Sequence, residues 1–379
     1  MSDVLSPLHD EHVALGAALT SFAGWQMPLR YTSDIAEHQA VRTAAGLFDL
    51  SHMGELEITG SQAAAALDHA LVGDLTALAL GRARYTMIVR EDGGVLDDLV
   101  VYRLAEDRFL VVANASNVAV VRDALTERLA GFDATLHDAS LTTALIAVQG
   151  PRAEEIVTSA AEPVDVDPIR ELKYYAAVNA TVSGVPALVA RTGYTGEDGF
   201  ELFVPAEAAA ALWRDLLAAG EPLGLVPAGL SARDSLRLEA GMPLYGNELD
   251  TTTTPYEAGL GRVVKLDKTG ADGAPLPFVG RAVLASRKGA QPARVLVGLR
   301  GLGKRAARHG YDVVMSTAPG SPVVGHVTSG APSPTLGYPI ALAYVTPEMC
   351  GEGRELAVDV RGRREPVVVV PVPFYRRPR

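Results

Sequence analysis

Six short apolar runs near the C-terminal end constrain the fold more than any other feature of this 379-residue chain. Strand-length runs at regular spacing, separated by glycine, proline and charged residues, are typical of a small antiparallel barrel or sandwich. We therefore predict a C-terminal β domain of one of these two kinds over residues 290–379. The runs occupy residues 293–300, 310–315, 325–330, 340–345, 355–360 and 365–374.

The first 275 residues mix helical and strand patterns, which predicts an α+β region over 1–275. A stretch rich in glycine and proline, residues 267–280, separates it from the β domain as a predicted linker. Three strand-like runs joined by short turns favour an antiparallel meander, and a strand at 143–150 and a hairpin over 180–204 follow. The meander covers 83–92, 93–104 and 108–116, and the predicted helices cover Pro7 to Leu19, Ser33 to a stop at Gly46, and 117–130.

Charge and cysteine content exclude several classes of protein. The chain has 34 basic and 45 acidic residues, a balance that argues against a nucleic-acid partner. Its one cysteine, Cys350, allows no disulfide within the chain and no cysteine-based zinc site, and indicates a cytoplasmic setting. The N-terminus lacks the pattern of a signal peptide, and no run of about 18 apolar residues predicts a membrane span.

Two motifs are weak matches to known binding sites. Residues 298–305, GLRGLGKR, have P-loop spacing, but Arg305 stands where a serine or threonine must bind Mg²⁺, so we interpret the segment as a basic hairpin. His9 and His12 lie near each other on a predicted helix without a third ligand nearby. No metal site is therefore predicted.

The segment GGVLDDLVVY, residues 93–102, places two carboxylates at the start of an apolar strand. Because side chains alternate along a strand, Asp98 and Tyr102 share one face and Asp97 lies on the other. Both aspartates could be turn residues beside the glycines. Alternatively, one is hydrogen-bonded or faces a cavity, because a buried unpaired carboxylate is costly. The pattern alone leaves both interpretations open.

Two further segments carry unusual charge. RTGYTGEDGFEL, residues 191–202, places an acidic, glycine-rich turn inside a hairpin, with Glu201 on the following strand and apart from a solvated Glu197–Asp198 pair. In SARDSLRLEAG, Arg233 and Arg237 are one helical turn apart. They could simply form a surface charge ladder with Asp234 or Glu239, which contributes only tenths of a kcal/mol.

Eight segments in order resemble the T protein (aminomethyltransferase) family of the glycine cleavage system. The resemblance extends from about residue 6 to the C-terminus without a large gap, and its strength lies in the succession of motifs. The segments are FAGWQMPLRY, GLFDLSHMGE, GGVLDDLVVY, ALIAVQGP, RTGYTGEDGFEL, GLSARDSLRLEAGMPLYGNELD, GHVTSGAPSPTLG and PFYRR.

The resemblance implies a three-domain, ring-like folate-binding fold with a C-terminal β-barrel. It also implies transfer of a one-carbon unit from the S-aminomethyldihydrolipoyl arm of H protein to tetrahydrofolate. Ammonia, 5,10-methylenetetrahydrofolate and dihydrolipoyl H protein are the expected products. H protein, with the P and L proteins of the same system, is the implied partner of a monomeric enzyme that needs no metal.

The family's functional residues map onto this chain one by one. Asp98 matches the critical acid, which would orient the folate amines and stabilise iminium character on the one-carbon fragment. Glu201 matches the carboxylate for the amide and amino edge of the pterin, and Arg233 matches the folate-binding arginine. The other expected folate-binding residues are Met53, Tyr85, Tyr102, Asn114, Tyr174 and Tyr194, and Arg376 is a candidate for the glutamyl tail.

The chain departs from the family pattern at one position, and two other classes of protein share the folate-binding module. Arg262 stands where many relatives carry an aromatic residue, so a ligand contact at that position is in doubt. Dimethylglycine and sarcosine oxidases use the same module but add a flavin domain, for which this chain has no fingerprint. Folate-binding proteins of iron–sulfur assembly carry a K-G-C-Y-x-G-Q-E segment, where this chain reads RTGYTGEDG.

Overall fold

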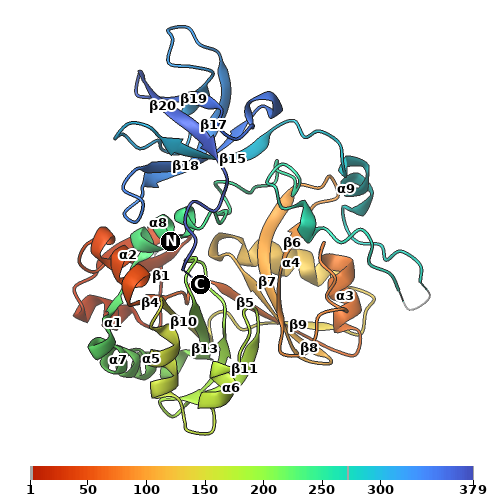
Figure 1. Ribbon diagram of the computed structural model, residues 1–379. Coiled ribbons are helices and arrows are strands. Elements are labelled where there is room, and N and C mark those ends of the chain that lie inside the picture. The colour runs from red at the N-terminus through yellow and green to blue at the C-terminus, as the bar shows by residue number, and fades with distance from the viewer. Residues whose placement is uncertain (1–2, 271–272, 379) are drawn as a thin grey trace. The chain divides into compact units, whose positions relative to one another are not determined.

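The computed structural model describes residues 3–270 and 273–378, and these form two compact units (Figure 1). The first unit contains the residues up to Ile88, Asp98–Gly193 and Glu197–Arg233. The second contains Val89–Asp97, Tyr194–Gly196 and the residues from Asp234 onward. Each unit is therefore assembled from segments that are far apart in the sequence.

A six-stranded sheet and its helices form one core of the first unit. The sheet is antiparallel apart from β14, which pairs with β4 in parallel. Buried side chains of α5 and α7, including the fully buried Trp213, pack in the same apolar cluster as the strands. The strand order is β11 (Ala177–Val182), β12 (Val185–Ala190), β13 (Gly199–Pro205), β10 (Thr143–Gln149), β4 (Ala45–Asp49) and β14 (Leu225–Pro227). The helices are α5 (Ala153–Ala160), α6 (Val166–Arg170) and α7 (Ala209–Gly220).

A five-stranded sheet forms the second core of this unit and confirms the predicted meander. Helix α4 approaches it so closely that a Cβ on Gly54 would lie 2.5 Å from Val118 Cγ2, so only glycine fits there. The order is β6 (Ala83–Val89), β7 (Val95–Ala105), β8 (Arg108–Ala113), β5 (Gly54–Thr59) and β9 (Thr135–Asp138). Its helices are α3 (Ala63–Ala70) and α4 (Val118–Leu129), the latter at the predicted position.

The N-terminal elements differ from the prediction. Helix α1 covers only His9–Ala14, because Gly16 turns the chain with a φ of 72° and the following residues pair as a strand. Helix α2 (Asp34–Thr43) ends before Gly46, which lies inside β4 rather than at a helix stop. A Cβ on Gly46 would lie 2.5 Å from Val41 Cγ2, so this glycine permits close helix packing. A three-stranded sheet of β1 (Val4–Leu5), β3 (Trp25–Arg30) and β2 (Ala18–Phe22) completes the region.

In the second unit, all six predicted C-terminal strands form a closed barrel. Apolar side chains that alternate along the strands fill its interior, among them the buried Val297, Leu299 and Val358. The barrel order is β15 (Val295–Gly301), β18 (Pro339–Val345), β17 (Val323–Pro332), β16 (Asp312–Val314), β19 (Glu355–Val360) and β20 (Arg363–Val370).

The other helices of the described residues are distributed over both units. They are α8 (Leu230–Glu239), which begins in the first unit, α9 (Arg281–Arg287), and the short 3-10 helices η1 (Ala115–Asn117), η2 (Ala206–Ala208), η3 (Glu221–Leu223), η4 (Gly261–Val263) and η5 (Pro347–Met349).

The predicted linker and the predicted basic hairpin both differ in detail. Residues 271–272 of the linker lie outside the described residues, but Lys268 beside them is buried, with its Nζ 4.4 Å from the centre of the Phe278 ring. The segment GLRGLGKR begins in β15 and continues into the connection to β16. These two strands are not neighbours in the barrel, so the connection is a crossing loop and not a hairpin.

The two glycines before β7 explain how the chain enters that strand. Gly93 has a φ of 83°, which favours glycine. At Gly94, a Cβ would lie only 2.0 Å from the Thr251 carbonyl oxygen. The tight turn is closed by the Arg90 amide, which donates to the Gly94 carbonyl oxygen at 2.8 Å.

Candidate active site

Asp98 lies in β7 with its carboxylate held by two neighbouring strands. The Tyr85 hydroxyl of β6 donates to Oδ2 at 3.0 Å, and Asn114, just after β8, donates from Nδ2 to Oδ1 at 2.9 Å. Asp97 is fully buried, whereas Asp98 is half-buried, as strand alternation requires. Both aspartates lie inside the strand, so the interpretation of the pair as turn residues is wrong.

Two side chains orient the Asp98 carboxylate. Tyr85 donates to one of its oxygens and Asn114 donates to the other. These donors fix the orientation of the carboxylate and stabilise its charge. The half-buried carboxylate can therefore accept a proton or a hydrogen bond from an amine of a ligand.

A second chain of hydrogen bonds leads from β7 to Glu201. Tyr102 is 1% exposed, and its hydroxyl lies 3.0 Å from Thr192 Oγ1, which in turn donates to Glu201 Oε2. Because threonine has only one hydroxyl proton and Glu201 receives it, Tyr102 is the donor to Thr192. The Thr192 hydroxyl therefore links Tyr102 to Glu201 by two hydrogen bonds, and no sequence pattern indicates this link.

The carboxyl group of Glu201 has a raised pKa, which describes the electrostatics of the site. Burial raises the pKa of its carboxyl above the usual value, while Thr192, Arg233 and Tyr102 partly oppose the shift. A carboxylate with this much desolvation is stabilised by N–H donors of a bound molecule. Glu201 therefore suits a ligand edge that carries several N–H groups.

The position of Arg233 is set by the start of helix α8. Glu37 of α2 accepts hydrogen bonds from the Gly229 amide at 2.9 Å and from the Tyr31 amide at 2.7 Å. Glu37 is 1% exposed, so these bonds tie α2, β3 and the beginning of α8 together inside the protein. Arg233 on the first turn of α8 is thereby held where its charge interacts with Glu201.

The two adjacent tyrosines differ sharply. Tyr174 is 45% exposed and packs edge-to-face with Tyr175, with ring centres 4.9 Å apart. Burial, followed by the neighbouring Tyr174, Glu201 and Asp98, raises the pKa of Tyr175. Tyr175 therefore interacts with both acidic centres of the site, although only Tyr174 was expected from the sequence.

Tyr175 also has an unusual backbone. Its φ is 60°, in the left-handed region that side chains rarely adopt. The Tyr175 amide donates to the Arg191 carbonyl at 3.0 Å, and the Ala83 amide donates to the Tyr175 carbonyl at 2.9 Å. No local sequence pattern predicts this conformation, because partners far away in the chain impose it.

Seven of the eight expected folate-binding residues belong to the first unit, as Asp98 does, and Tyr194 does not. Met53 is half-buried in the turn before β5. Tyr194 belongs to the second unit, where its hydroxyl donates to the Pro243 carbonyl oxygen. Arg262 and Arg376 are exposed and also belong to the second unit. The first-unit set comprises Asp98, Met53, Tyr85, Tyr102, Asn114, Tyr174, Glu201 and Arg233.

Comparison with known proteins identifies the family. Residues 8–268 match the family described as the GCVT N-terminal domain, and residues 294–376 match the glycine cleavage T-protein C-terminal barrel domain. An aminomethyltransferase of Streptomyces coelicolor is 60% identical over 97% of this chain and 96% of its own length. The chain belongs to the glycine cleavage T-protein family.

Other relatives agree. An aminomethyltransferase of Saccharopolyspora erythraea is 57% identical over 98% of both chains. The crystal structure of the glycine cleavage system aminomethyltransferase T from Bartonella henselae matches with a TM-score of 0.89 at 35% identity, covering 99% of each chain. The expected T-protein fold, mixed helix and sheet with a C-terminal barrel, is thus confirmed. So is the activity: this chain is a folate-dependent aminomethyltransferase of the glycine cleavage system.

The acidic turn of this T-protein chain is not solvated as predicted. Glu197 is buried and forms an ion pair with Arg42 of α2, with Arg42 Nη1 and Glu197 Oε1 2.8 Å apart. Asp198 pairs with Arg191. Both acids therefore have arginine partners within the first unit, and Glu197 in particular does not face water.

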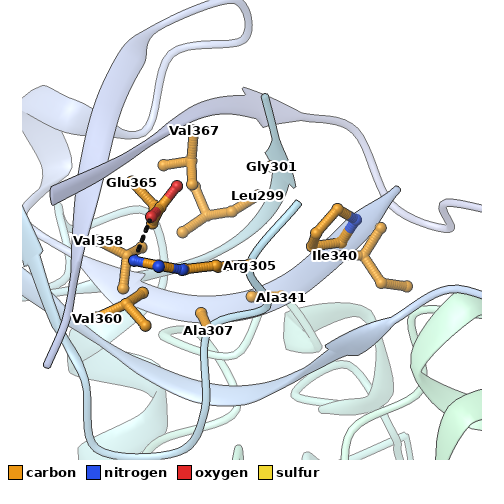
Figure 2. Close-up of a pocket in the computed structure, with 11 residues that line it drawn as sticks. Leu299, Gly301, Arg305, Ala307, Ile340, Ala341, Val358, Val360, Glu365 and Val367 are labelled. Atoms are coloured by element: carbon orange, nitrogen blue, oxygen red, sulfur yellow. Dashed lines mark hydrogen bonds and ion pairs between the residues drawn. The ribbon is translucent and has the colours of Figure 1, made fainter. Parts of the chain in front are cut away.

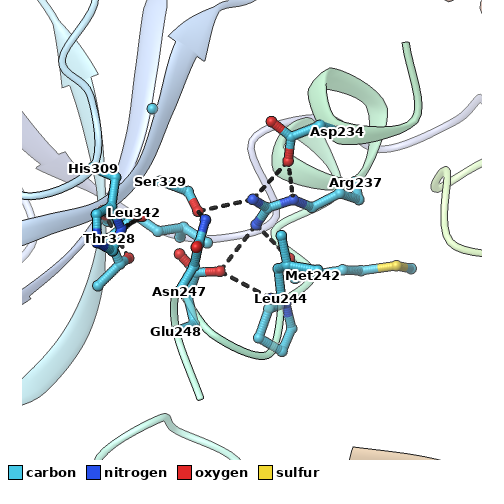
Figure 3. Close-up of polar contacts among 12 residues, drawn as sticks. Asp234, Arg237, Met242, Leu244, Asn247, Glu248, His309, Thr328, Ser329 and Leu342 are labelled. Carbon is cyan, nitrogen blue, oxygen red and sulfur yellow. Dashed lines mark hydrogen bonds and ion pairs between the residues drawn. The ribbon is translucent and has the colours of Figure 1, made fainter. Parts of the chain in front are cut away.

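Arg237 is a structural residue of the T-protein chain and not a surface charge. It is 1% exposed and donates from Nη1 to Glu248 Oε2 at 3.0 Å and from Nη2 to Ser329 Oγ at 2.8 Å (Figure 3). It also pairs with Asp234 at 2.7 Å, so the predicted ladder partner is present. Glu239 instead accepts hydrogen bonds from Ser333 and Thr335. A buried network replaces the expected surface ladder.

A pocket at the barrel has few side chains that could take part in a reaction. Its lining is mostly apolar, and its one ion pair joins Arg305 Nη1 to Glu365 Oε1 at 3.3 Å (Figure 2). Arg305, the residue that breaks the P-loop pattern, is thus a partner of β20. Within residues 3–270 and 273–378, no cluster of three or more metal-ligating side chains occurs, and no helix is long and apolar enough to cross a membrane.

Proposed function

We propose that the Asp98 group of the first unit binds tetrahydrofolate and carries the one-carbon transfer. The observation that supports this most directly is the half-buried Asp98 carboxylate, oriented by Tyr85 and Asn114. Within the same unit, Glu201 and Arg233 would bind the folate, with Glu201 at the N–H edge of the pterin. Met53, Tyr85, Tyr102, Asn114 and Tyr174 would line the pocket, and Tyr194 stays a proposed folate-binding residue.

The chemistry is a transfer in which protons are conserved. The folate nitrogens N5 and N10 each lose a proton and bond to the methylene carbon. The carbon–sulfur and carbon–nitrogen bonds of the aminomethyl group break, and the two protons complete ammonia and the dihydrolipoyl thiol. Asp98 would accept a proton from a folate amine and stabilise positive charge on the one-carbon fragment. Its role is positional and electrostatic, without a covalent intermediate.

The decisive experiment measures formation of 5,10-methylenetetrahydrofolate from aminomethylated H protein and tetrahydrofolate. The Asp98→Asn variant keeps the shape of the side chain but loses its charge. We expect it to bind folate and to turn over at least about a thousandfold more slowly, as for loss of a group that acts in the transition state. Glu57→Gln, on the same sheet but paired with Arg108, is the matched control. Equal rates for Asp98→Asn and wild type would rule out the proposed role.

Lipoylated H protein is the proposed donor, working with the P and L proteins, and we propose that this chain meets it as a cytoplasmic monomer. Three exposed cations of the crossing loop, Lys304, Arg305 and Arg308, are candidates for its docking surface. Replacing all three by alanine should weaken the apparent affinity for H protein and leave tetrahydrofolate binding unchanged. Unchanged affinity for H protein would eliminate this surface.

We also propose a functional division of the chain at the linker. Residues 1–275 would bind folate, and residues 290–379 would form the accessory barrel. The separate family matches at 8–268 and 294–376 support this division.

A further inference from the structure

His52 lies directly before Met53, in the turn that joins β4 to β5. Other groups hold this turn in place. The Ser51 amide donates to Asp49 Oδ1 at 2.8 Å, the Met53 amide donates to the Leu50 carbonyl oxygen at 2.9 Å, and the Leu145 amide donates to Ser51 Oγ at 3.2 Å. The position of the His52 backbone therefore does not depend on a hydrogen bond from its own ring.

The His52 ring is buried with an unmet hydrogen-bonding capacity. The residue is 2% exposed, and its Nδ1 has no hydrogen-bond partner among the described residues. Phe22 contacts the ring edge-to-face, with ring centres 5.5 Å apart, but offers no polar atom. A buried polar atom without a partner costs stability, so a phenylalanine would suit the folded protein better. Packing alone therefore does not account for an imidazole at this position.

The charges around His52 favour a neutral ring. Burial and then the positive charge of Arg233 lower the pKa of His52 to about 4, while Asp49 partly opposes the shift. Asp49 is already engaged by Ser6, His12 and Ser51. The imidazole is consequently neutral at physiological pH, with one N–H donor and one acceptor nitrogen.

His52 is also coupled electrostatically to the charged part of the candidate site. Arg233 interacts electrostatically with both His52 and Glu201. A guanidinium and a neutral imidazole N–H both donate hydrogen bonds, so together they favour an oxygen acceptor. A carbonyl or carboxylate oxygen placed at this point would bind to the charged Arg233 and use the otherwise unmet capacity of His52.

We propose that His52 is a further tetrahydrofolate-binding residue, which acts beside Arg233 and donates to a carbonyl or carboxylate oxygen of the folate. This inference rests on the proposed function of the same site. The ring adds a directed hydrogen bond without adding a second positive charge. It therefore complements Arg233 instead of competing with it.

The test compares dissociation constants for tetrahydrofolate, measured by anaerobic calorimetry. His52→Phe preserves the contact with Phe22 but removes both nitrogens, and we expect its Kd to rise at least about tenfold, as for a lost hydrogen bond to a charged or polar ligand group. His52→Gln, which keeps a donor and an acceptor, should recover part of the loss. His69→Phe in α3, another histidine beside a phenylalanine, is the control and should bind like wild type. Without ligand, His52→Phe should melt at or above the wild-type temperature.

The outcomes separate the two proposals. If wild type fails to bind tetrahydrofolate, the proposed function fails. If wild type binds and His52→Phe binds equally well, only the role of His52 is overturned. Should His52→Phe not fold, nitrogen NMR of the wild-type imidazole serves instead. A shift of the His52 ring nitrogens on addition of tetrahydrofolate supports the proposal, and an unchanged ring overturns it.

Discussion

Two carboxylates of the first unit, Asp49 and Asp98, both accept hydrogen bonds from neighbouring side chains but differ in how deeply they are buried. Asp49 is 3% exposed and accepts hydrogen bonds from Ser6, from the Ser51 amide at 2.8 Å, and from His12 Nε2 at 2.8 Å. Burial by itself raises the pKa of Asp49, but these bonds outweigh burial and hold the pKa below its usual value. Asp98 accepts hydrogen bonds from Tyr85 and Asn114 but is only half-buried.

His12 and His52 also differ in whether their ring nitrogens have hydrogen-bond partners. His12 is fully buried, with Nε2 on Asp49 and Nδ1 2.8 Å from the Tyr31 hydroxyl. His52 is equally buried but has an orphan Nδ1 among the described residues. Polar groups that are satisfied from within the protein hold the fold together, whereas those left incomplete are available to a ligand. Substitutions in the two groups should therefore have opposite consequences for stability and activity.

The largest expected effect is a loss of stability when the hydrogen bonds to the buried Asp49 are broken. His12→Ala leaves the buried Asp49 carboxylate without the imidazole that contacts its Oδ2 at 2.8 Å, and breaking a buried pair in this way costs about 3–5 kcal/mol. Urea unfolding should show this loss as a lower midpoint with an unchanged slope. A loss below about 1 kcal/mol would show that Asp49 is satisfied without His12.

The second-largest effect is expected to be a slower turnover when a donor to Asp98 is removed. Tyr85→Phe removes one of the two side-chain donors that orient Asp98, and we expect kcat to fall about tenfold, equivalent to about 1.4 kcal/mol. Because Tyr85 is only half-buried, the melting temperature should hardly change. A variant that loses stability but keeps its turnover would place Tyr85 with the scaffold instead.

A smaller effect should appear in the pH dependence of stability. The pKa of His52 is about 4 in the folded protein and near its ordinary 6.5 when unfolded, so the unfolded chain binds the proton first as pH falls. Stability is therefore complete above about pH 6.5 and is lost on the way down to about pH 4. Between pH 7.5 and 5.5 we expect about 1 kcal/mol of loss from this residue. His52→Phe should show a correspondingly shallower decline, and parallel curves for the two proteins would contradict the shift.

The smallest effect is expected outside both groups. Glu57 and Arg108 form a partly exposed pair at 2.8 Å on the β5–β8 ladder. Glu57→Gln should change stability by less than about 0.5 kcal/mol, as is usual for such pairs. A larger change in denaturant unfolding would show that this sheet surface is coupled to the core.

The features that were predicted correctly depend on local periodicity. Alternation along β7 separates Asp97 from Asp98, and regular strand spacing predicts the C-terminal β domain. The pairing of Arg42 with Glu197 was missed, because 155 residues separate the two in the sequence. Thr192 and Tyr175 were missed for a related reason, since tertiary partners create their roles. The first helix was predicted too long, because its apolar pattern continues past the point where Gly16 turns the chain.

The left-handed backbone of Tyr175 has a consequence for how this protein can evolve. An L-amino acid in that region bears conformational strain of about 1–2 kcal/mol, which glycine would avoid. A glycine at 175 would relax the chain but would remove the ring that interacts with Asp98 and Glu201. The tyrosine is therefore kept at 175 at a conformational cost, and any substitution there exchanges relief of backbone strain for loss of the contacts of the ring.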